Sequence, residues 1–189
     1  MGGMTRRSAV AAGLALISWA VTALAAGPEV GKAVPALKVL DVTGQNSPNE
    51  VDYAELRKEL PTVYVFVPAD KWDRPTARFL RKLDEAVAKQ DQASYVVAVW
   101  LTDDVEKTKK YLPLAQQSLQ FGRAALACYT ADKSGPREWQ LDLAASLTII
   151  VAAQGKIAEV RDYRSVNETL VPEVLEALKK AAGKAESGK

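Results

Sequence analysis

An apolar run that leads directly into a helical pattern is the feature that most restricts the fold of this chain. Residues 62–67 read TVYVFV, which is rich in β-branched and aromatic residues and shows little alternation with polar ones. Such a run predicts a strand that is covered on both faces. From Thr76 to Val87, apolar residues recur at three- and four-residue spacing. This spacing predicts a helix with one apolar stripe, joined to the strand by the turn KWDRP.

The same order of elements is repeated farther along the chain. Residues 94–102, SYVVAVWLT, read as a second buried strand. Asp103, with Glu106 three residues later, is typical of a helix start and predicts a helix over residues 104–119. Strand, helix, strand and helix at these lengths predict a parallel βαβ unit with a right-handed crossover.

Shorter elements flank this unit on both sides. It is preceded by a strand at 34–42, a turn-rich loop at 44–49 and a brief helix at 53–60. It is followed by a strand at 124–130, a hairpin turning at Gln154 and Gly155, and a helix at 168–182. We therefore expect one α/β domain over residues 26–182, with a central mixed sheet and helices on both faces. A flexible polar tail is expected at 183–189.

The N-terminal segment has the layout of a secretory signal. Two arginines precede an apolar run from Ala9 to Leu24, and Ala23-Leu24-Ala25 forms a small-x-small cleavage motif. The run is short and is followed by this motif, which favours a cleaved signal peptide over an uncleaved membrane anchor. We expect cleavage after Ala25, a periplasmic or secreted mature protein, and no stable membrane span after cleavage.

Charge and residue usage exclude several classes of function. The chain has 25 Lys and Arg residues against 23 Asp and Glu residues, and the expected signal segment holds two arginines and no acid. The mature chain would therefore have no net charge, which gives no electrostatic case for nucleic acid. With one cysteine, Cys128, and no histidine, the sequence disfavours an internal disulfide, the usual zinc and copper sites, and Ser-His-Asp or Cys-His catalysis. We expect no metal and no cofactor.

Four segments, in this order, resemble the thioredoxin superfamily, in particular its exported thioredoxin-like and alkyl hydroperoxide reductase (redoxin) branch. They are VGKAVPALKVLDVTG, TVYVFVPADKW, WDRPT and LTIIVAAQGKIAEV, and the likeness covers residues 31–182. The resemblance implies a thioredoxin-like three-layer sandwich. It also implies thiol-disulfide or peroxide chemistry, if the active-site cysteines are present.

The resemblance places the active-site turn at WDRPT, where the family has Trp-Cys-x-Pro-Cys. Trp72 and Pro75 match this motif, whereas Asp73 and Thr76 stand in place of the two cysteines. Dithiol exchange requires one thiol to attack and a second to resolve the mixed disulfide. The motif is therefore degenerate and gives no confident catalytic residue. Alignment with the peroxide-reductase branch places Arg74 at the nucleophile position and leads to the same conclusion.

A second departure from the family lies before the late hairpin. The family has a cis-proline directly before the threonine equivalent to Thr148, and this chain has Leu147. A non-proline cis bond costs about 3–4 kcal/mol, so we expect a trans bond and an altered peptide-docking edge. The candidate binding residues from the resemblance are Trp72, Asp73, Arg74, Pro75, Leu147 and Thr148.

Three residues allow two interpretations each. Asp73 is either an N-cap that accepts from the N–H of Thr76 or a catalytic carboxylate, and the lack of an accompanying acid, His or metal-ligand set favours the cap. Trp72 is either a contact residue at the rim of a site or a packing residue. Cys128 lies in the apolar run AALACYT, which favours a buried inert thiol over a reactive one.

The sequence thus predicts an exported thioredoxin-like protein that lacks the redox dithiol. We expect a non-catalytic binding or accessory module for an extracytoplasmic protein or peptide, not for nucleic acid. The alternative is a thiol-disulfide oxidoreductase or antioxidant protein that uses Cys128 as its single thiol.

Overall fold

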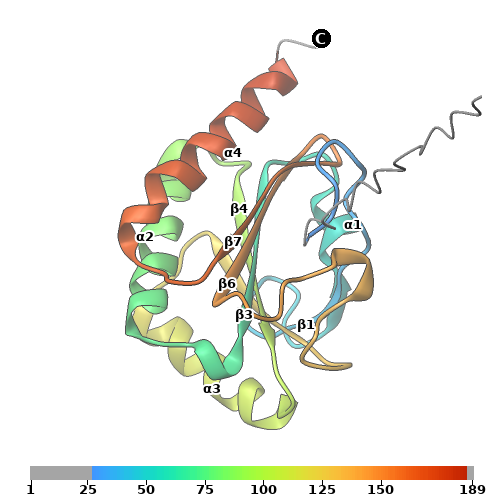
Figure 1. Cartoon of the computed structure of the whole chain (residues 1–189). Coiled ribbons are helices and arrows are strands. Elements are labelled where there is room, and N and C mark those ends of the chain that lie inside the picture. The colour runs from blue at the N-terminus through green and yellow to red at the C-terminus, as the bar shows by residue number, and fades with distance from the viewer. Residues whose placement is uncertain (1–26, 187–189) are drawn as a thin grey trace, which may run out of the picture.

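The computed structural model describes residues 27–186, so the predicted signal segment lies outside the described residues. A seven-stranded mixed sheet forms the middle layer, between three long helices and a second layer of short elements (Figure 1). The helices are α1 (Tyr53–Arg57), α2 (Arg74–Gln90), α3 (Val105–Leu119) and α4 (Val171–Glu186), with single turns η1 (Ala69–Lys71), η2 (Arg137–Trp139) and η3 (Glu168–Leu170). The strands are β1 (Lys38–Asp41), β2 (Glu50–Asp52), β3 (Thr62–Pro68), β4 (Tyr95–Leu101), β5 (Ala124–Tyr129), β6 (Leu147–Ala153) and β7 (Lys156–Tyr163).

The strand order is β2-β1-β5-β4-β3-β6-β7. Strands β3, β4 and β5 are parallel. In the pair of β3 and β4, Thr62 lies opposite Tyr95 at one end and Pro68 lies opposite Leu101 at the other. The other neighbouring strands pair antiparallel. This arrangement confirms the predicted parallel βαβ unit, and it brings the carboxyl ends of β3 and β4 to the same edge of the sheet.

The sheet separates two apolar cores. Val63, Val65 and Val67 of β3 point to a core that also includes buried side chains of α2, α3 and α4. The alternate residues Tyr64 and Phe66 point to the opposite core, which α1 and the segment around η2 cover. The predicted strand at residues 62–67 is therefore covered on both faces, because each face meets its own core.

Trp139 anchors the irregular segment before β6 to this second core. Its side chain is fully buried, and its ring centroid lies 5.1 Å from that of Tyr64 and 5.0 Å from that of Phe66. The indole N–H donates to the carbonyl oxygen of Ala36 at 3.0 Å. This partner satisfies the polar atom of a tryptophan that is otherwise in apolar surroundings.

The N-terminal part of the described chain lies along the outer edge of β7. The N–H of Gly31 donates to the carbonyl oxygen of Ile157 at 2.8 Å, and the N–H of Ile157 donates to that of Lys32 at 2.9 Å. Val34 donates in turn to the carbonyl oxygen of Gly155 at 2.9 Å. These bonds cover the first half of an edge strand that would otherwise present unpaired backbone groups.

Several local predictions can be compared with the structure directly. The late hairpin turns at Gln154 and Gly155, whose φ angles of 55° and 69° are those of a type I′ turn, as predicted. The N-cap of α3 is Asp104, whose carboxylate accepts from the N–H of Lys107, so the helix begins one residue later than the spacing of Asp103 and Glu106 indicates. Strand β2 was not predicted.

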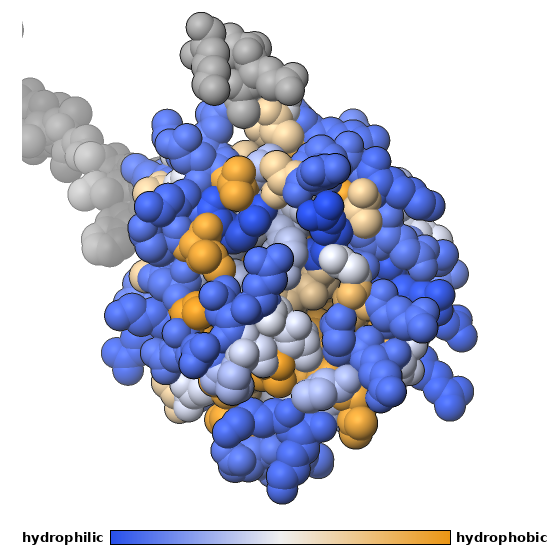
Figure 2. Space-filling model, turned by 180° about the vertical axis from the view of Figure 1, so that it is seen from behind, coloured by the Kyte–Doolittle hydropathy of each residue, from blue (hydrophilic) through white to orange (hydrophobic). Residues whose placement is uncertain are grey.

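The surface is mostly hydrophilic, and hydrophobic side chains form small separate groups when the molecule is viewed from behind (Figure 2). The exposed large hydrophobic side chains in the described range are Val30, Leu56, Leu60, Tyr111, Leu114 and Leu143. A helix long and apolar enough to span a membrane is not found within residues 27–186.

Candidate binding site at the ends of the parallel strands

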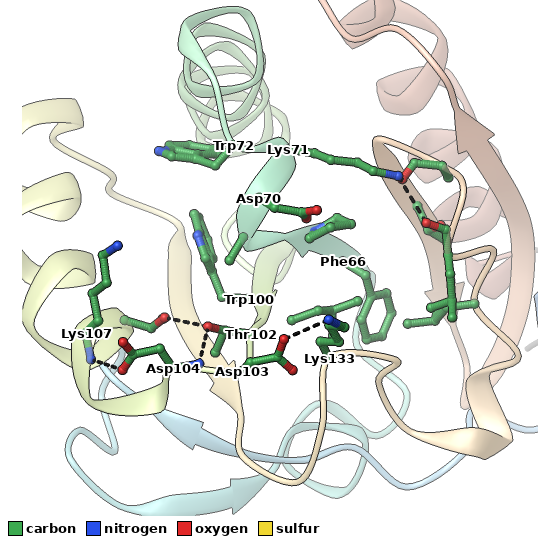
Figure 3. Close-up of a pocket in the computed structure, with 18 of the residues that line it drawn as sticks. Phe66, Asp70, Lys71, Trp72, Trp100, Thr102, Asp103, Asp104, Lys107 and Lys133 are labelled. Carbon is green, nitrogen blue, oxygen red and sulfur yellow. Dashed lines mark hydrogen bonds and ion pairs between the residues drawn. The ribbon is translucent and has the colours of Figure 1, made fainter.

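A cavity of about 630 Å³ opens where β3 and β4 end. Open α/β sheets place ligand crevices at such carboxyl ends, because the loops that follow neighbouring strands diverge there. Its walls come from η1, the start of α3 and the segment between β5 and β6 (Figure 3). The lining residues are Phe66, Pro68, Ala69, Asp70, Lys71, Trp72, Trp100, Leu101, Thr102, Asp103, Asp104, Lys107, Thr108, Tyr111, Lys133, Leu141, Asp142, Leu143, Ala145 and Thr148.

Aromatic side chains form one wall of this cavity. The rings of Trp72 and Trp100 meet edge to face, with centroids 4.9 Å apart and planes at 63°. The indole N–H of Trp72 donates to the hydroxyl oxygen of Tyr111 at 2.6 Å. Trp72 is half-buried and lines the cavity. Trp72 therefore packs against Trp100 and also lines the cavity, while its role as a contact residue stays a prediction.

Lys71 joins η1 to the loop that precedes β6. Its ammonium group donates to the carbonyl oxygens of Leu143, Ala144 and Ala145 at 3.0, 3.0 and 2.8 Å. All three of its protons thus have partners, because a lysine ammonium has three donors. The contact fixes two walls of the cavity relative to each other, although 72 or more sequence positions separate them.

The α3 side of the cavity carries a small polar network. The hydroxyl oxygen of Thr102 accepts from the N–H of Asp104 at 3.0 Å and from the hydroxyl of Thr108 at 3.2 Å. Lys133 donates to a carboxylate oxygen of Asp103 at 2.8 Å. The hydrogen bond and charge of Asp103 raise the pKa of Lys133, so this lysine stays charged over the physiological pH range.

The turn at residues 72–76 lies beside the cavity and contains no cysteine. Asp73 is exposed and is the N-cap of α2, and its carboxylate accepts from the N–H of Thr76 at 2.9 Å, which confirms the predicted cap. The Thr76 side chain is almost fully buried. Arg74 and Pro75 are exposed on the first turn of the helix. Asp73, Arg74 and Pro75 do not line the cavity.

The two candidate residues at the start of β6 differ in their surroundings. Leu147 is fully buried in the helix-side core, so its side chain offers no surface to a ligand, although the sequence placed it among the binding residues. Thr148 lines the cavity, and its hydroxyl donates to a carboxylate oxygen of Asp162 at 2.5 Å. The Ser146–Leu147 bond is trans, as expected from the absence of proline, since the cis bond in residues 27–186 is Ser47–Pro48.

Cys128 lies apart from the cavity. Its side chain is fully buried on β5, and its sulfur lies 3.6 Å from the carbonyl oxygen of Tyr129. Burial raises the pKa of the Cys128 thiol to about 11. The thiol is therefore protonated near neutral pH, and the thiolate that would act as a nucleophile is scarce. The described residues also contain no cluster of three Cys, Asp or Glu side chains that is placed to hold a metal ion.

The sequence located Trp72 and Thr148 at the site but missed most of the cavity. Trp100 and Tyr111 were assigned to a strand and a helix without a functional role, and Asp70 was given no role. One signal in the sequence could have placed Trp100 and Tyr111 at the cavity. Parallel neighbouring strands bring their carboxyl ends together, so the residues that end β4 and begin the helix after it meet those that follow β3.

Comparison with known proteins identifies the fold. No family model and no curated protein matches the sequence. Among solved structures, a peroxiredoxin-like protein from Aquifex aeolicus has a TM-score of 0.57 at 17% identity, covering 82% of this chain and 90% of that one. A thiol peroxidase from Chromobacterium violaceum has a TM-score of 0.58 at 13% identity, and the match covers 86% of this chain and 90% of that chain.

A yeast mitochondrial 1-Cys peroxiredoxin has a TM-score of 0.60 at 14% identity, covering 85% of this chain and 79% of that chain. At such identities the likeness concerns the fold and not the activity. The mixed sheet, its order and its covering helices agree with the architecture that the resemblance implied. This chain has the thioredoxin-like fold.

Proposed function

We propose that this protein is exported and binds a protein or peptide segment through the cavity at the ends of β3 and β4, without exchanging disulfides. One observation carries the proposal: a cavity with an aromatic wall lies beside a helix N-terminus where a carboxylate, Asp73, caps the helix in place of a thiol. The volume of about 630 Å³ falls within the usual range for ligand sites.

The composition of the cavity favours a peptide-like ligand. Trp72 and Tyr111 present aromatic surface next to the polar groups of Thr102 and Asp70, a mixture that is typical of the centre of binding interfaces. Tyr111 and Leu143 at the cavity are exposed large hydrophobic side chains, which normally carry a cost in water. A partner that covers them would remove this cost.

The alternative function depends on Cys128 and has weaker support. A catalytic thiol must be reachable and must form a thiolate, whereas Cys128 is fully buried with a raised pKa. Nor does Cys128 line the cavity. The binding proposal requires no chemistry at this residue.

The binding proposal is tested with a library of random heptapeptides displayed on phage. Selection on immobilised protein comprising residues 26–189 should enrich a family of related peptides, which are then synthesised and titrated while tryptophan fluorescence is recorded. Tyr111→Ala should weaken binding about tenfold, as expected for an aromatic contact residue. Leu114→Ala is the matched control, because Leu114 is an exposed residue of the same helix that does not line the cavity. Equal effects of the two substitutions, or no enrichment, would contradict the proposal.

The absence of disulfide exchange is tested separately. The protein should reduce insulin disulfides and hydrogen peroxide no faster than buffer with the same reductant, and Cys128→Ser should give the same rates. Activity above background in the wild type that disappears in Cys128→Ser would instead support the alternative function.

Export is tested with the N-terminal segment itself. Residues 1–30 fused to a reporter that folds actively only outside the cytoplasm should give activity in a bacterial host, and the processed product should begin at Ala26. Replacing Ala23 and Ala25 by bulky residues should prevent processing, because the cleavage motif requires small residues. Processing that is unaffected would show that the cleavage site has been misplaced.

A further inference from the structure

We infer that this cavity selects a cationic side chain, Lys or Arg, of the bound segment, with Asp70 as the charged recognition group. The inference rests on the proposed peptide-binding function and adds the chemical identity of the group that enters the cavity. Three observations carry it: the state of the Asp70 carboxylate, the engagement of the other lining charges, and the aromatic wall.

Asp70 projects into the cavity with its carboxylate unengaged. It belongs to η1, which directly follows β3, and in Figure 3 its side chain points to the space between Trp72 and Phe66. Within residues 27–186, no hydrogen bond or ion pair joins this carboxylate to another side chain or to the backbone. Its oxygens are therefore available to a ligand, and a carboxylate can accept two hydrogen bonds side by side from a guanidinium group.

The other lining carboxylates are already occupied. Asp103 accepts from Lys133, Asp104 caps α3 by accepting from the N–H of Lys107, and Asp142 accepts from Arg164. Each of them would have to give up or share a partner to bind a cation. Asp70 would not, so it provides the favourable position for a positive charge.

The lining cations form no hydrogen bond or ion pair with Asp70. The three protons of Lys71 are directed to carbonyl oxygens, and Lys133 is bonded to Asp103, with Asp70 making only a smaller contribution to its raised pKa. Lys107 is exposed and lies on the α3 side of the cavity, apart from Asp70 (Figure 3). An anionic ligand would have to rely on Lys107, since the other two lining cations already have partners.

The aromatic wall adds a second preference for cations. The faces of aromatic rings carry partial negative charge, so they attract ammonium and guanidinium groups and disfavour anions. Trp72, Trp100 and Phe66 all line the cavity with Asp70, but Trp100 and Phe66 are buried, so Trp72 provides the aromatic surface that a ligand can reach. The alkyl stem of a lysine or arginine can pack on Trp72 while its charged end reaches the carboxylate. The half-buried ring and the carboxylate together match a long side chain with a terminal positive charge.

The first test uses the sequences of the selected peptides and four synthetic versions of the best one. We expect Lys or Arg at one position of most selected sequences. Versions with Lys or Arg there should bind about tenfold more tightly than one with Gln, because a charge-assisted hydrogen bond is replaced by a neutral contact. A version with Glu should bind most weakly. The preference for Lys over Gln should decrease in high salt.

The second test changes the cavity. Asp70→Asn should weaken the Lys peptide about tenfold and leave the Gln peptide nearly unchanged. Glu106→Gln is the matched control: it removes one exposed negative charge from α3 outside the cavity and should affect both peptides equally. Lys133→Gln should strengthen binding of the Lys peptide severalfold, because it removes a nearby positive charge. A gain of affinity of this kind is not expected from damage to the fold.

The outcomes separate the inference from the proposed function. Peptides without a basic residue whose binding depends on Tyr111 would overturn the inference and leave peptide binding in place. Tighter binding of the Glu peptide than of the Lys peptide, lost in Lys107→Gln, would also overturn the inference and leave peptide binding in place. If the wild type retains no peptide, both the inference and the proposed function fail. An unchanged Lys-over-Gln preference in folded Asp70→Asn would also overturn the inference.

Discussion

At the scale of single residues, Asp73 shows how a carboxylate at the N-terminus of a helix serves that helix. The N-terminus of a helix favours an anion, whether it is a thiolate or a carboxylate. In this chain the anion is a carboxylate that accepts the N–H of Thr76. The contribution of such a group is to helix stability, since a carboxylate cannot exchange disulfides.

The cap leads to a prediction about stability. Asp73→Ala removes the acceptor for the Thr76 N–H and should lower the free energy of unfolding by about 0.5–2 kcal/mol. Asp73→Asn should remain close to the wild type, because asparagine caps helices about as well as aspartate. Urea unfolding followed by circular dichroism measures both. If the two variants lose equal stability, the negative charge and not the hydrogen bond is the important feature.

Cys128 gives a prediction about alkaline pH. Burial raises the pKa of its thiol from the ordinary 9.0 to about 11, so the folded state retains a proton that the unfolded state releases. Its stabilising contribution is complete below pH 9 and is lost as the pH rises from 9 to 11. The stability advantage of the wild type over Cys128→Ala should therefore decrease across this interval. The difference between the two proteins is the relevant quantity, because burial also raises the pKa of Tyr53 and Tyr64, which both proteins contain.

A thiol reagent gives an independent measurement on Cys128. At neutral pH the folded protein should react far more slowly than the unfolded one, since the buried thiol is neither reachable nor ionised. Rapid reaction in the folded state, at a rate that urea does not increase, would mean that Cys128 is accessible. The alternative function would then regain support.

At the scale of elements, the contact between η1 and the loop before β6 decides the shape of the cavity. Lys71→Met removes three hydrogen bonds but keeps a long apolar stem, and should lower the free energy of unfolding by about 1–2 kcal/mol. Lys133→Met is the control, because an exposed ion pair contributes about 0–1 kcal/mol. Hydrogen exchange should also be faster in residues 143–146 of Lys71→Met. Unchanged exchange there would show that the loop is held by other contacts.

The long elements were predictable because each carries its own repeating pattern. Strands β3 and β4 are continuous apolar runs, and α2 has a regular apolar stripe. Strand β2 was missed because Glu50–Asp52 is only three residues long and has a single apolar side chain. Its hydrogen bonds come from pairing with β1, which is a non-local interaction. Helix α4 extends to Glu186, beyond residue 182, although Gly183 is a poor helix former.

The cavity was less predictable for a related reason. The sequence located the turn at Trp72, because a family motif marks it. The partners of that turn come from distant and irregular segments: Lys71 contacts carbonyl oxygens near residue 144, and Trp72 contacts Tyr111 of α3. Contacts between backbone carbonyls and a lysine leave no pattern in the sequence, since any residue provides a carbonyl group.

At the scale of the whole molecule, the two cores should respond differently to the loss of a tryptophan. Trp139→Ala removes a fully buried side chain from the second core and should cost about 3–5 kcal/mol, a large part of the stability of an ordinary domain. Trp72→Ala removes a half-buried side chain at the cavity and should cost less, while affecting peptide binding more. Thermal and urea unfolding measure the first effect, and peptide titration measures the second. Equal stability losses would mean that Trp72 is mainly a core residue.

The bonds between residues 31–34 and the edge of β7 have a consequence for the order of folding. The first described part of the chain pairs with the last hairpin, at Gly155 and Ile157, so this edge is completed only when almost the whole chain is available. Contacts between such distant positions form late, because a long loop must first be closed. A chain that crosses a membrane unfolded and from its N-terminus would meet this condition only when β7 has emerged, and until then residues 31–34 would lack their partner strand.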